Sequence, residues 1–356
     1  MDHRARQRKF AAAVQEAKAD AFLLTHLANI RYLCGFTGSA GVLAYAKGRF
    51  TLFTDGRYTE QARQEVTGAR VVISKKPALA AAAERLAGAR VRRAGVEAEH
   101  MTLAARASLG KLLKAALRPT SGLVERLRMI KDVSELQLIE GAVRLGSSLF
   151  DTVVKAIRPG ASEASVAAEL EYAARRGGAE GMSFDSIVAA GEHSALPHWR
   201  ASSQPIPNTG FVVLDFGVIL SGYCSDMTRT VWVGKSDQAA RDLYQTVLEA
   251  QLAGVEAVRP GATTGEVDGA ARRVLQRARL ARYFTHSTGH GVGLEIHEAP
   301  RLARGQTEVL RPGMVVTIEP GAYIAGKGGV RIEDMVTVTE TGHRVLTPTT
   351  KEFISI

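Results

Sequence analysis

The stretch 211–233, FVVLDFGVILSGYCSDMTRTVWV, decides the fold of the C-terminal part of the chain. Its two β-rich runs are joined near Ser221–Gly222, which predicts a β-hairpin. A two-residue turn at this pair would place Asp226 opposite Gly217, and a turn one residue earlier would place Asp226 opposite Asp215. In either register both carboxylates lie on one face of an otherwise apolar hairpin. Such carboxylates repel each other unless a cation or a strong donor lies between them.

A second pair of carboxylates lies near the C-terminus. The run MVVTIEPG (314–321) predicts an apolar strand that carries Glu319, and GVRIEDMVTV (329–338) predicts another that carries Glu333. A glycine-rich turn at 326–329 separates them. Arg331 precedes Glu333 by two residues and should share its face of the strand.

Histidines lie between the two carboxylate pairs, in HSTGHGVGLEIHEAP (286–300). Three of the nine histidines of the chain, His286, His290 and His297, fall within 12 residues. The flanking glycines allow close backbone packing around His290.

Ion pairing is the alternative explanation for buried carboxylates, because structural ion pairs also place acids in a core. The only cations near the four acids in the sequence are Arg229 and Arg331, which are too few. Four carboxylates and one imidazole therefore predict a metal site, and this oxygen-rich set favours Mn²⁺, with Co²⁺ or Zn²⁺ as alternatives. Carboxylates can bridge two ions about 3.5 Å apart that hold a water or hydroxide, which predicts hydrolysis of an acyl bond.

Alternating helix and strand patterns in the first third predict an α/β domain, and the fold class of the whole is α/β and α+β. We expect domains at residues 1–125 and 126–356. Two RPG triplets, at 158–160 and 259–261, each follow a helical pattern and precede a Ser or Thr and a Glu that suit a new helix. These two copies suggest an internally duplicated α+β second domain.

Composition limits the cellular setting. Of the 356 residues 46% are hydrophobic and 23% charged, and no apolar run is long enough for a membrane span. Two cysteines and the lack of a secretory signal favour the cytoplasm. The net charge of +10 could indicate a nucleic-acid partner, but the basic residues are scattered along the sequence and form no run, so we expect no nucleic acid and no membrane as partners.

Around the predicted metal ligands the chain resembles the pita-bread metallopeptidases (family M24B), the family of methionine aminopeptidase, aminopeptidase P and prolidase. The similar stretches are DFG with Asp215, SDMTRT with Asp226, GHGVGLEIHEAP with His290, TIEPG with Glu319 and GVRIED with Glu333. The first third resembles the creatinase-type N-terminal domain through NIRYLCGFTGSAG (29–41) and FTDGRY (53–58). The resemblance implies that a creatinase-like domain precedes a pita-bread catalytic domain, and it favours the Xaa-Pro branch.

The resemblance also implies roles for individual residues. Two divalent ions, Mn²⁺ by preference, would be bound by Asp215, Asp226, His290, Glu319 and Glu333. Glu319 would in addition accept the proton of the bridging water. His198 and His297 would hydrogen-bond the substrate and stabilise the tetrahedral intermediate. The residues that would bind substrate or support the site are His286, Tyr323 and Arg331.

The function implied is that of a dinuclear Xaa-Pro aminopeptidase (aminopeptidase P), which hydrolyses the bond before a proline at the second position of a peptide. An Xaa-Pro dipeptidase (prolidase), restricted to dipeptides, is the alternative, and it requires a cation that binds the proline carboxylate. A non-catalytic binding protein of this fold is a remote alternative. The family's habit of dimerisation suggests a homodimer.

Overall fold

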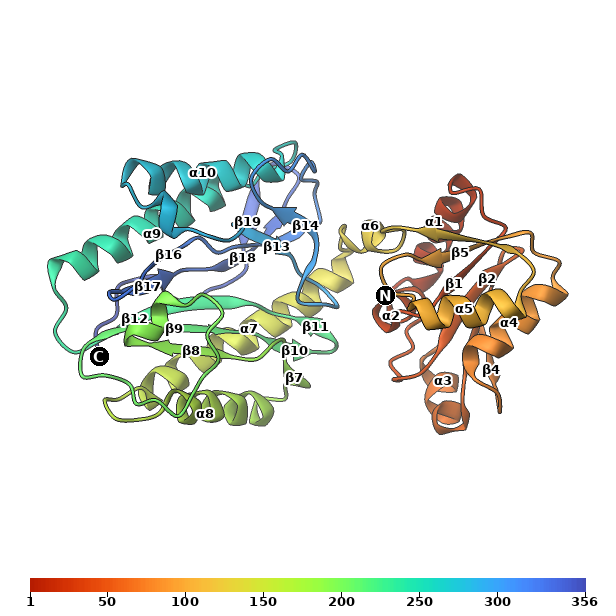
Figure 1. Ribbon diagram of the computed structural model, residues 1–356, viewed down its shortest axis with the longest axis horizontal. Coiled ribbons are helices and arrows are strands. Elements are labelled where there is room, and N and C mark those ends of the chain that lie inside the picture. Colours follow the sequence, from red (N-terminus) through yellow and green to blue (C-terminus); the bar gives the residue numbers. More distant parts are fainter. The chain divides into compact units, whose positions relative to one another are not determined.

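The chain folds into two compact units, Met1–Arg128 and Met129–Ile356. A computed structural model describes all residues, 1–356, and Figure 1 shows the elements of each unit. The unit boundary lies three residues after the one expected from sequence. No helix has both the length and the apolar character needed to cross a membrane.

The N-terminal unit is built on a six-stranded sheet in the order β4-β3-β2-β1-β5-β6. β2 is antiparallel to both β1 and β3, and the other neighbours are parallel. The strands are β1 (Ala21–Leu24), β2 (Val42–Ala46), β3 (Arg49–Thr54), β4 (Ala69–Ile73), β5 (Arg93–Glu97) and β6 (Ala116–Thr120). The helices are α1 (His3–Glu16), α2 (Leu27–Cys34), α3 (Thr59–Glu65), α4 (Ala78–Gly88), α5 (Leu103–Leu112) and α6 (Glu125–Arg128).

Apolar side chains cover this sheet. Phe10 of α1 packs edge-on against Phe22 of β1, with ring centroids 5.4 Å apart, and it also meets Tyr45 and Phe50. A separate cluster joins Leu86 of α4 to alanines, valines and leucines of the central strands. The expected α/β architecture is confirmed, although α2, β5, α5 and β6 were not predicted.

The C-terminal unit repeats one helical arrangement twice. A long helix, α7 (Val133–Ala156) or α9 (Gln238–Glu256), is followed by an RPG stop and then by a helix of 14 residues, α8 (Glu163–Arg176) or α10 (Thr264–Arg277). Both Pro-Gly glycines have left-handed backbones, with φ of 83° at Gly160 and 85° at Gly261. The long helices end at Ala156 and Glu256, and the Pro-Gly pairs form the turns that follow them, where glycine adopts positive φ without steric cost. The duplicated α+β arrangement is confirmed.

Three sheets and a two-stranded ribbon lie between these helices, with α9 and α10 on one side and α8 on the other (Figure 1). Their orders are β12-β9-β8, β11-β10-β7 and β14-β13-β15-β18-β19, with β16-β17 as the ribbon. The strands of the first half are β7 (Gly181–Met182), β8 (Ile187–Ala190), β9 (Gly210–Phe216), β10 (Val218–Leu220), β11 (Tyr223–Cys224) and β12 (Met227–Val233). Those of the second half are β13 (Gly289–Gly291), β14 (Glu298–Leu302), β15 (Val315–Ile318), β16 (Gly321–Ile324), β17 (Gly328–Arg331), β18 (Asp334–Val338) and β19 (His343–Val345).

The predicted hairpin forms with its turn at Ser221–Gly222, which is the register that places Asp226 opposite Gly217. Both turn residues have positive φ, 51° and 76°, which suits the tight turns that join antiparallel strands. β9 pairs with β12 so that Asp215 lies opposite Thr228, and this register continues through β10 and β11. The hairpin is divided between two sheets. At the division, a Cβ on Gly217 would lie 1.8 Å from the carbonyl oxygen of Ser225, so only glycine fits there.

Candidate metal centre

The four acidic residues predicted as ligands lie at or beside breaks between strands. Asp215 is the penultimate residue of β9, and Asp226 fills the gap between β11 and β12. Glu319 follows β15, and Glu333 separates β17 from β18. The prediction that both glutamates lie inside strands is therefore wrong. Within a strand, successive side chains point to opposite faces of the sheet, but at a break this alternation no longer holds. The acidic side chain can then turn toward the site while its apolar neighbours remain in the core.

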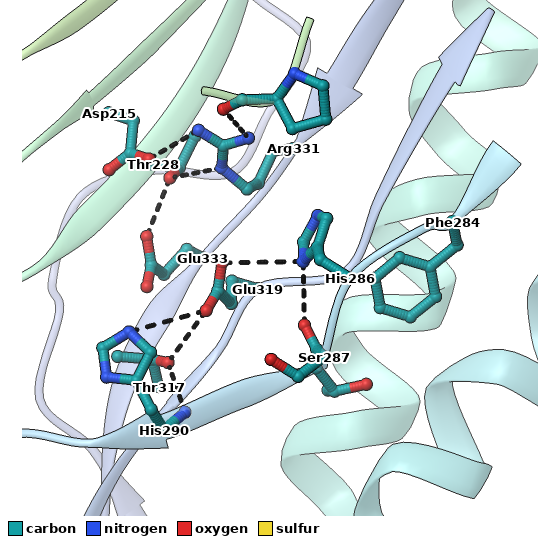
Figure 2. A network of polar contacts seen from close by, with 12 residues as sticks. Asp215, Thr228, Phe284, His286, Ser287, His290, Thr317, Glu319, Arg331 and Glu333 are labelled. Atoms are coloured by element: carbon teal, nitrogen blue, oxygen red, sulfur yellow. Dashed lines mark hydrogen bonds and ion pairs between the residues drawn. The ribbon is translucent and has the colours of Figure 1, made fainter. Parts of the chain in front are cut away.

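The side chains of Asp226, His290 and Glu333 meet closely. One possible ligand atom from each of these three lies within 4.8 Å of the others. Nε2 of His290 lies 3.6 Å from a carboxylate oxygen of Asp226 and 3.6 Å from one of Glu319. Figure 2 shows Glu319, Glu333 and His290 directed toward the same space.

Backbone contacts fix the orientation of His290. Its Nδ1 lies 3.0 Å from the carbonyl oxygen of Gly291, and this acceptor requires the proton to be on Nδ1. The lone pair of Nε2 is then directed at Asp226 and Glu319, as in a histidine that binds a metal. Gly289 on β13 permits the approach of β15, since a Cβ there would lie 1.9 Å from the Thr317 carbonyl oxygen.

Arg331 is the single cation that contacts the ligand set. Its Nη2 donates to Oδ2 of Asp215 at 2.5 Å, and its Nε donates to Oγ1 of Thr228 at 3.1 Å. Thr228 in turn donates to Oε2 of Glu333 at 2.7 Å. Arg331 also donates a hydrogen bond to the hydroxyl of Tyr323, and this hydroxyl lies 2.9 Å from Nε2 of His286. Figure 2 shows Arg331 with Asp215 and Glu333. Arg331 and Tyr323 are both buried, and they hold the surrounding groups in place.

Burial and mutual repulsion raise the pKa values of the acids in the metal-free site. Desolvation, followed by the charge of Glu333, raises the pKa of Asp226 well above its ordinary value. Desolvation and the charge of Glu319 do the same to the pKa of Glu333. Burial also raises the pKa of Glu319 to about 8. Burial lowers the pKa of His290 to about 4, so its imidazole is neutral and free to bind a cation at neutral pH.

These residues fit a divalent metal centre. Oδ1 of Asp215 is buried and has no hydrogen-bond partner, although its other oxygen is bonded to Arg331. A buried acceptor without a donor is costly, and a bound cation would satisfy it. Four carboxylates with one arginine leave an excess of negative charge. The donor set of carboxylate oxygens and one neutral imidazole suits hard divalent ions.

A cavity of about 720 Å³ opens onto the centre. Its lining includes the five predicted ligands together with His198, His286, His297, Trp199 and Arg331. His198 and His297 are exposed within it, and the His297 ring lies 4.4 Å from the His290 ring. Burial lowers the pKa of His286 to about 3, so this imidazole is neutral. The structure thus brings every predicted site residue except Tyr323 to the lining of this cavity. Tyr323 is hydrogen-bonded to two of the lining residues, His286 and Arg331.

Three residues of the site were missed in the sequence. Thr228 links Glu333 to Arg331, and Thr317 accepts from the backbone N–H of His290. The position of Thr228, two residues after Asp226, was a usable signal, because a polar residue in an apolar strand needs a partner. Arg301 lies directly opposite His290 in the β13–β14 pair and lines the cavity. No sequence signal singled it out, because the pairing of β13 with β14 was unknown.

Two family models match the chain. The model of metallopeptidase family M24 matches residues 137–340, which is more than half of the chain. The chain belongs to metallopeptidase family M24. The creatinase/prolidase N-terminal domain matches residues 6–130. As an M24 member the protein is a hydrolase of peptides that depends on divalent metal.

Solved M24 structures resemble the chain along its full length. An Xaa-Pro dipeptidase from Bacillus anthracis is 43% identical, with each chain covered completely and a TM-score of 0.97. A prolidase from Pyrococcus horikoshii OT3 is 35% identical over 98% of this chain and 100% of that one, with a TM-score of 0.94. An X-Pro aminopeptidase from Thermotoga maritima MSB8 is 32% identical over 97% and 100%, with a TM-score of 0.90. Among these three, similarity is greater to the two dipeptidases.

Proposed function

We propose that this M24 peptidase is an Xaa-Pro dipeptidase, which hydrolyses dipeptides with a C-terminal proline. This choice replaces the expectation of an aminopeptidase. The greater similarity to dipeptidases supports it, and so does a free cation at the cavity. The observation that carries the proposal is the position of Arg301.

Arg301 is suited to bind the carboxylate of a dipeptide. Residues directly opposite in an antiparallel pair project from the same face, so Arg301 is on the side of the sheet that carries the His290 ring. Its side chain is exposed and makes no hydrogen bond or ion pair within the protein. A guanidinium binds a carboxylate through two parallel hydrogen bonds. In a longer peptide the proline has no free carboxylate, and this interaction is lost.

The chain would hold two divalent ions through Asp215, Asp226, His290, Glu319 and Glu333. When bound, such ions supply a nucleophilic water at neutral pH and polarise the scissile carbonyl. Glu319 would accept a proton from this water, because its carboxylate is directed toward the same space as the other ligands and lies 3.6 Å from Nε2 of His290. His198 and His297, which are exposed in the cavity, would donate hydrogen bonds to the reacting carbonyl oxygen.

Proline explains why a site of this kind is needed. The Xaa-Pro bond has no N–H, so a protease that binds its substrate as an extended strand lacks the hydrogen bond that this N–H would donate. Recognition through the substrate's carboxylate and ring avoids that requirement.

The test compares substrates with and without a carboxylate next to proline. The wild-type protein should hydrolyse Ala-Pro with a kcat/KM at least about tenfold above that for Ala-Pro-amide or Ala-Pro-Gly, because one charged hydrogen-bonded pair contributes about 1.5–3 kcal/mol. Arg301→Gln should remove most of this preference. Arg200→Gln is the matched control, because Arg200 also lines the cavity but is paired with an acid of the protein. Its Nη2 lies 3.8 Å from Oδ2 of Asp185. Equal hydrolysis of the tripeptide by the wild type would reject the dipeptidase in favour of an aminopeptidase.

A further inference from the structure

The net positive charge of the chain comes from one unit. Residues 1–128 contain 23 Lys and Arg residues and 10 Asp and Glu residues, whereas residues 129–356 contain 23 and 26. The whole surplus of +10 therefore belongs to the N-terminal unit, which contains none of the predicted metal ligands. The expectation that the basic residues are merely scattered does not hold in three dimensions.

Five arginines of this unit line one cavity of about 530 Å³. They come from four elements that are distant in sequence: Arg4 and Arg8 from α1, Arg49 from β3, Arg70 from β4 and Arg85 from α4. No aspartate or glutamate is among the lining residues. Arg4 and Arg8 are four residues apart on one helix, a spacing at which like charges destabilise the helix.

None of these five arginines makes a hydrogen bond or ion pair within the protein. Several other cations of the unit are paired: Arg57 with Asp55, Arg63 with Glu60, and Arg93 with Asp20. A second basic cavity, lined by Lys47, Arg90, Arg92 and Arg93, is also lined by Asp20. In the five-arginine cavity, by contrast, no lining carboxylate offsets the positive charge.

Buried aromatic side chains line the cavity together with the arginines. Tyr45 and Phe50 pack against each other, with ring centroids 4.8 Å apart, and both pack against Phe10. Gly68 also lines the cavity, and a Cβ there would lie 2.4 Å from Oε1 of Gln7. A concave site of this volume is the size of a small-molecule pocket.

We propose that this cavity binds a small oligophosphate anion, either a free phosphate chain or the triphosphate of a nucleotide. A guanidinium matches the geometry of phosphate oxygens and stays charged at every physiological pH. Five of them suit an anion with several negative charges better than a single carboxylate. Single-stranded nucleic acid fits less well, because its bases stack on exposed aromatic rings, and Tyr45 and Phe50 are only 6% and 7% exposed.

The test is a calorimetric titration with inorganic tripolyphosphate near physiological salt. The wild-type protein should bind one tripolyphosphate at the cavity, and Arg49→Gln with Arg70→Gln should weaken that binding at least about tenfold, since two charge-assisted contacts are lost. Arg106→Gln with Arg118→Gln is the matched control, because it removes the same charge from exposed positions outside the cavity. It should change the affinity less than about twofold. Because tripolyphosphate can also chelate ions of the metal centre, all proteins are compared at equal metal content.

A second arm identifies the source of the phosphates. ATP that binds as tightly as tripolyphosphate indicates recognition of the phosphate chain alone, and tighter ATP binding indicates a nucleotide; either supports the proposal. Equal affinity in wild type and the Arg49/Arg70 variant would overturn it. So would an equal loss in both double variants, or binding of a single-stranded oligonucleotide without binding of tripolyphosphate. Melting temperature and peptidase activity should be the same in all three proteins, so a failure here leaves the proposed dipeptidase function unaffected.

Discussion

At the scale of single residues, the centre is defined by acids that have too few counter-charges. Asp226 and Glu333 are 5% and 1% exposed, and the only cation that contacts the ligand set, Arg331, donates to Asp215. The other local arginine, Arg229, forms an ion pair with Asp334, in which Nη2 lies 2.8 Å from Oδ1. Metal binding explains why such an arrangement is maintained, because a cation removes both the repulsion and the desolvation cost.

Removal of one ligand should empty the centre. We expect Asp226→Ala and Glu333→Ala to bind less than one metal ion per chain and to lose at least about 1000-fold in kcat/KM, because the bound water and its activation are lost together. Metal analysis after dialysis, with circular dichroism as the check on folding, measures this. Near-normal turnover of either variant in metal-supplemented buffer would show that the assigned ligands are wrong.

Metal binding should release protons at neutral pH. Burial raises the pKa of Glu319 to about 8, so the metal-free site holds a proton at pH 7, and the pKa values of Asp226 and Glu333 are raised as well. A metal binds only the ionised carboxylates. Metal affinity should therefore fall as the pH is lowered from about 8 and become less dependent on pH above that value. Calorimetry in buffers of different ionisation enthalpy counts the protons. Binding at pH 7 without proton release would contradict these raised pKa values.

His297 should affect turnover and not metal content. Its exposed ring faces the cavity beside His290, and it belongs to no group of close metal ligands. We expect His297→Ala to lower kcat by about 100-fold with little change in bound metal, because a hydrogen bond that forms to the transition state is lost. Loss of metal from this variant would instead make His297 a ligand.

At the scale of elements, strand breaks place the ligands, and this was only partly predictable. The hairpin at 211–233 follows from the apolar runs and from Ser221–Gly222, whereas the choice between the two possible registers came from the structure. The division of that hairpin between two sheets does not follow from local sequence, because it depends on the close contact at Gly217 with Ser225. The ligand types were likewise readable from sequence, but Arg301 required the pairing of β13 with β14.

Gly217 should be essential for this geometry. In Gly217→Ala the new methyl group would meet the Ser225 carbonyl at 1.8 Å, so the backbone beside Asp226 must move. We expect a loss of about 1–3 kcal/mol in the free energy of unfolding and weaker metal binding. Gly110→Ala is the control, since nothing lies within 4 Å of the new Cβ and alanine favours the helix α5. Chemical denaturation of both variants measures the difference; equal stability would show that the close contact at Gly217 is relieved without cost.

At the scale of the whole molecule, the two units differ in the sign of their net charge and in the ligands they are suited to bind. Composition gave the total charge but not its distribution in space, since the five cavity arginines lie between positions 4 and 85 of the sequence. The duplicated helix pattern, in contrast, was visible in the two RPG triplets because helix stops are local signals. Long-range pairing accounts for most of what sequence could not supply.

A crystal structure of the Mn²⁺-loaded protein, measured at a wavelength where manganese scatters anomalously, tests the central claim most directly. We predict two anomalous peaks, both surrounded by Asp215, Asp226, His290, Glu319 and Glu333. The N-terminal unit provides an internal comparison, because His26, His100 and Glu125 also bring possible ligand atoms within 4.8 Å of one another. Peaks found only at that second group, or none among the five C-terminal side chains, would contradict the metal centre described above.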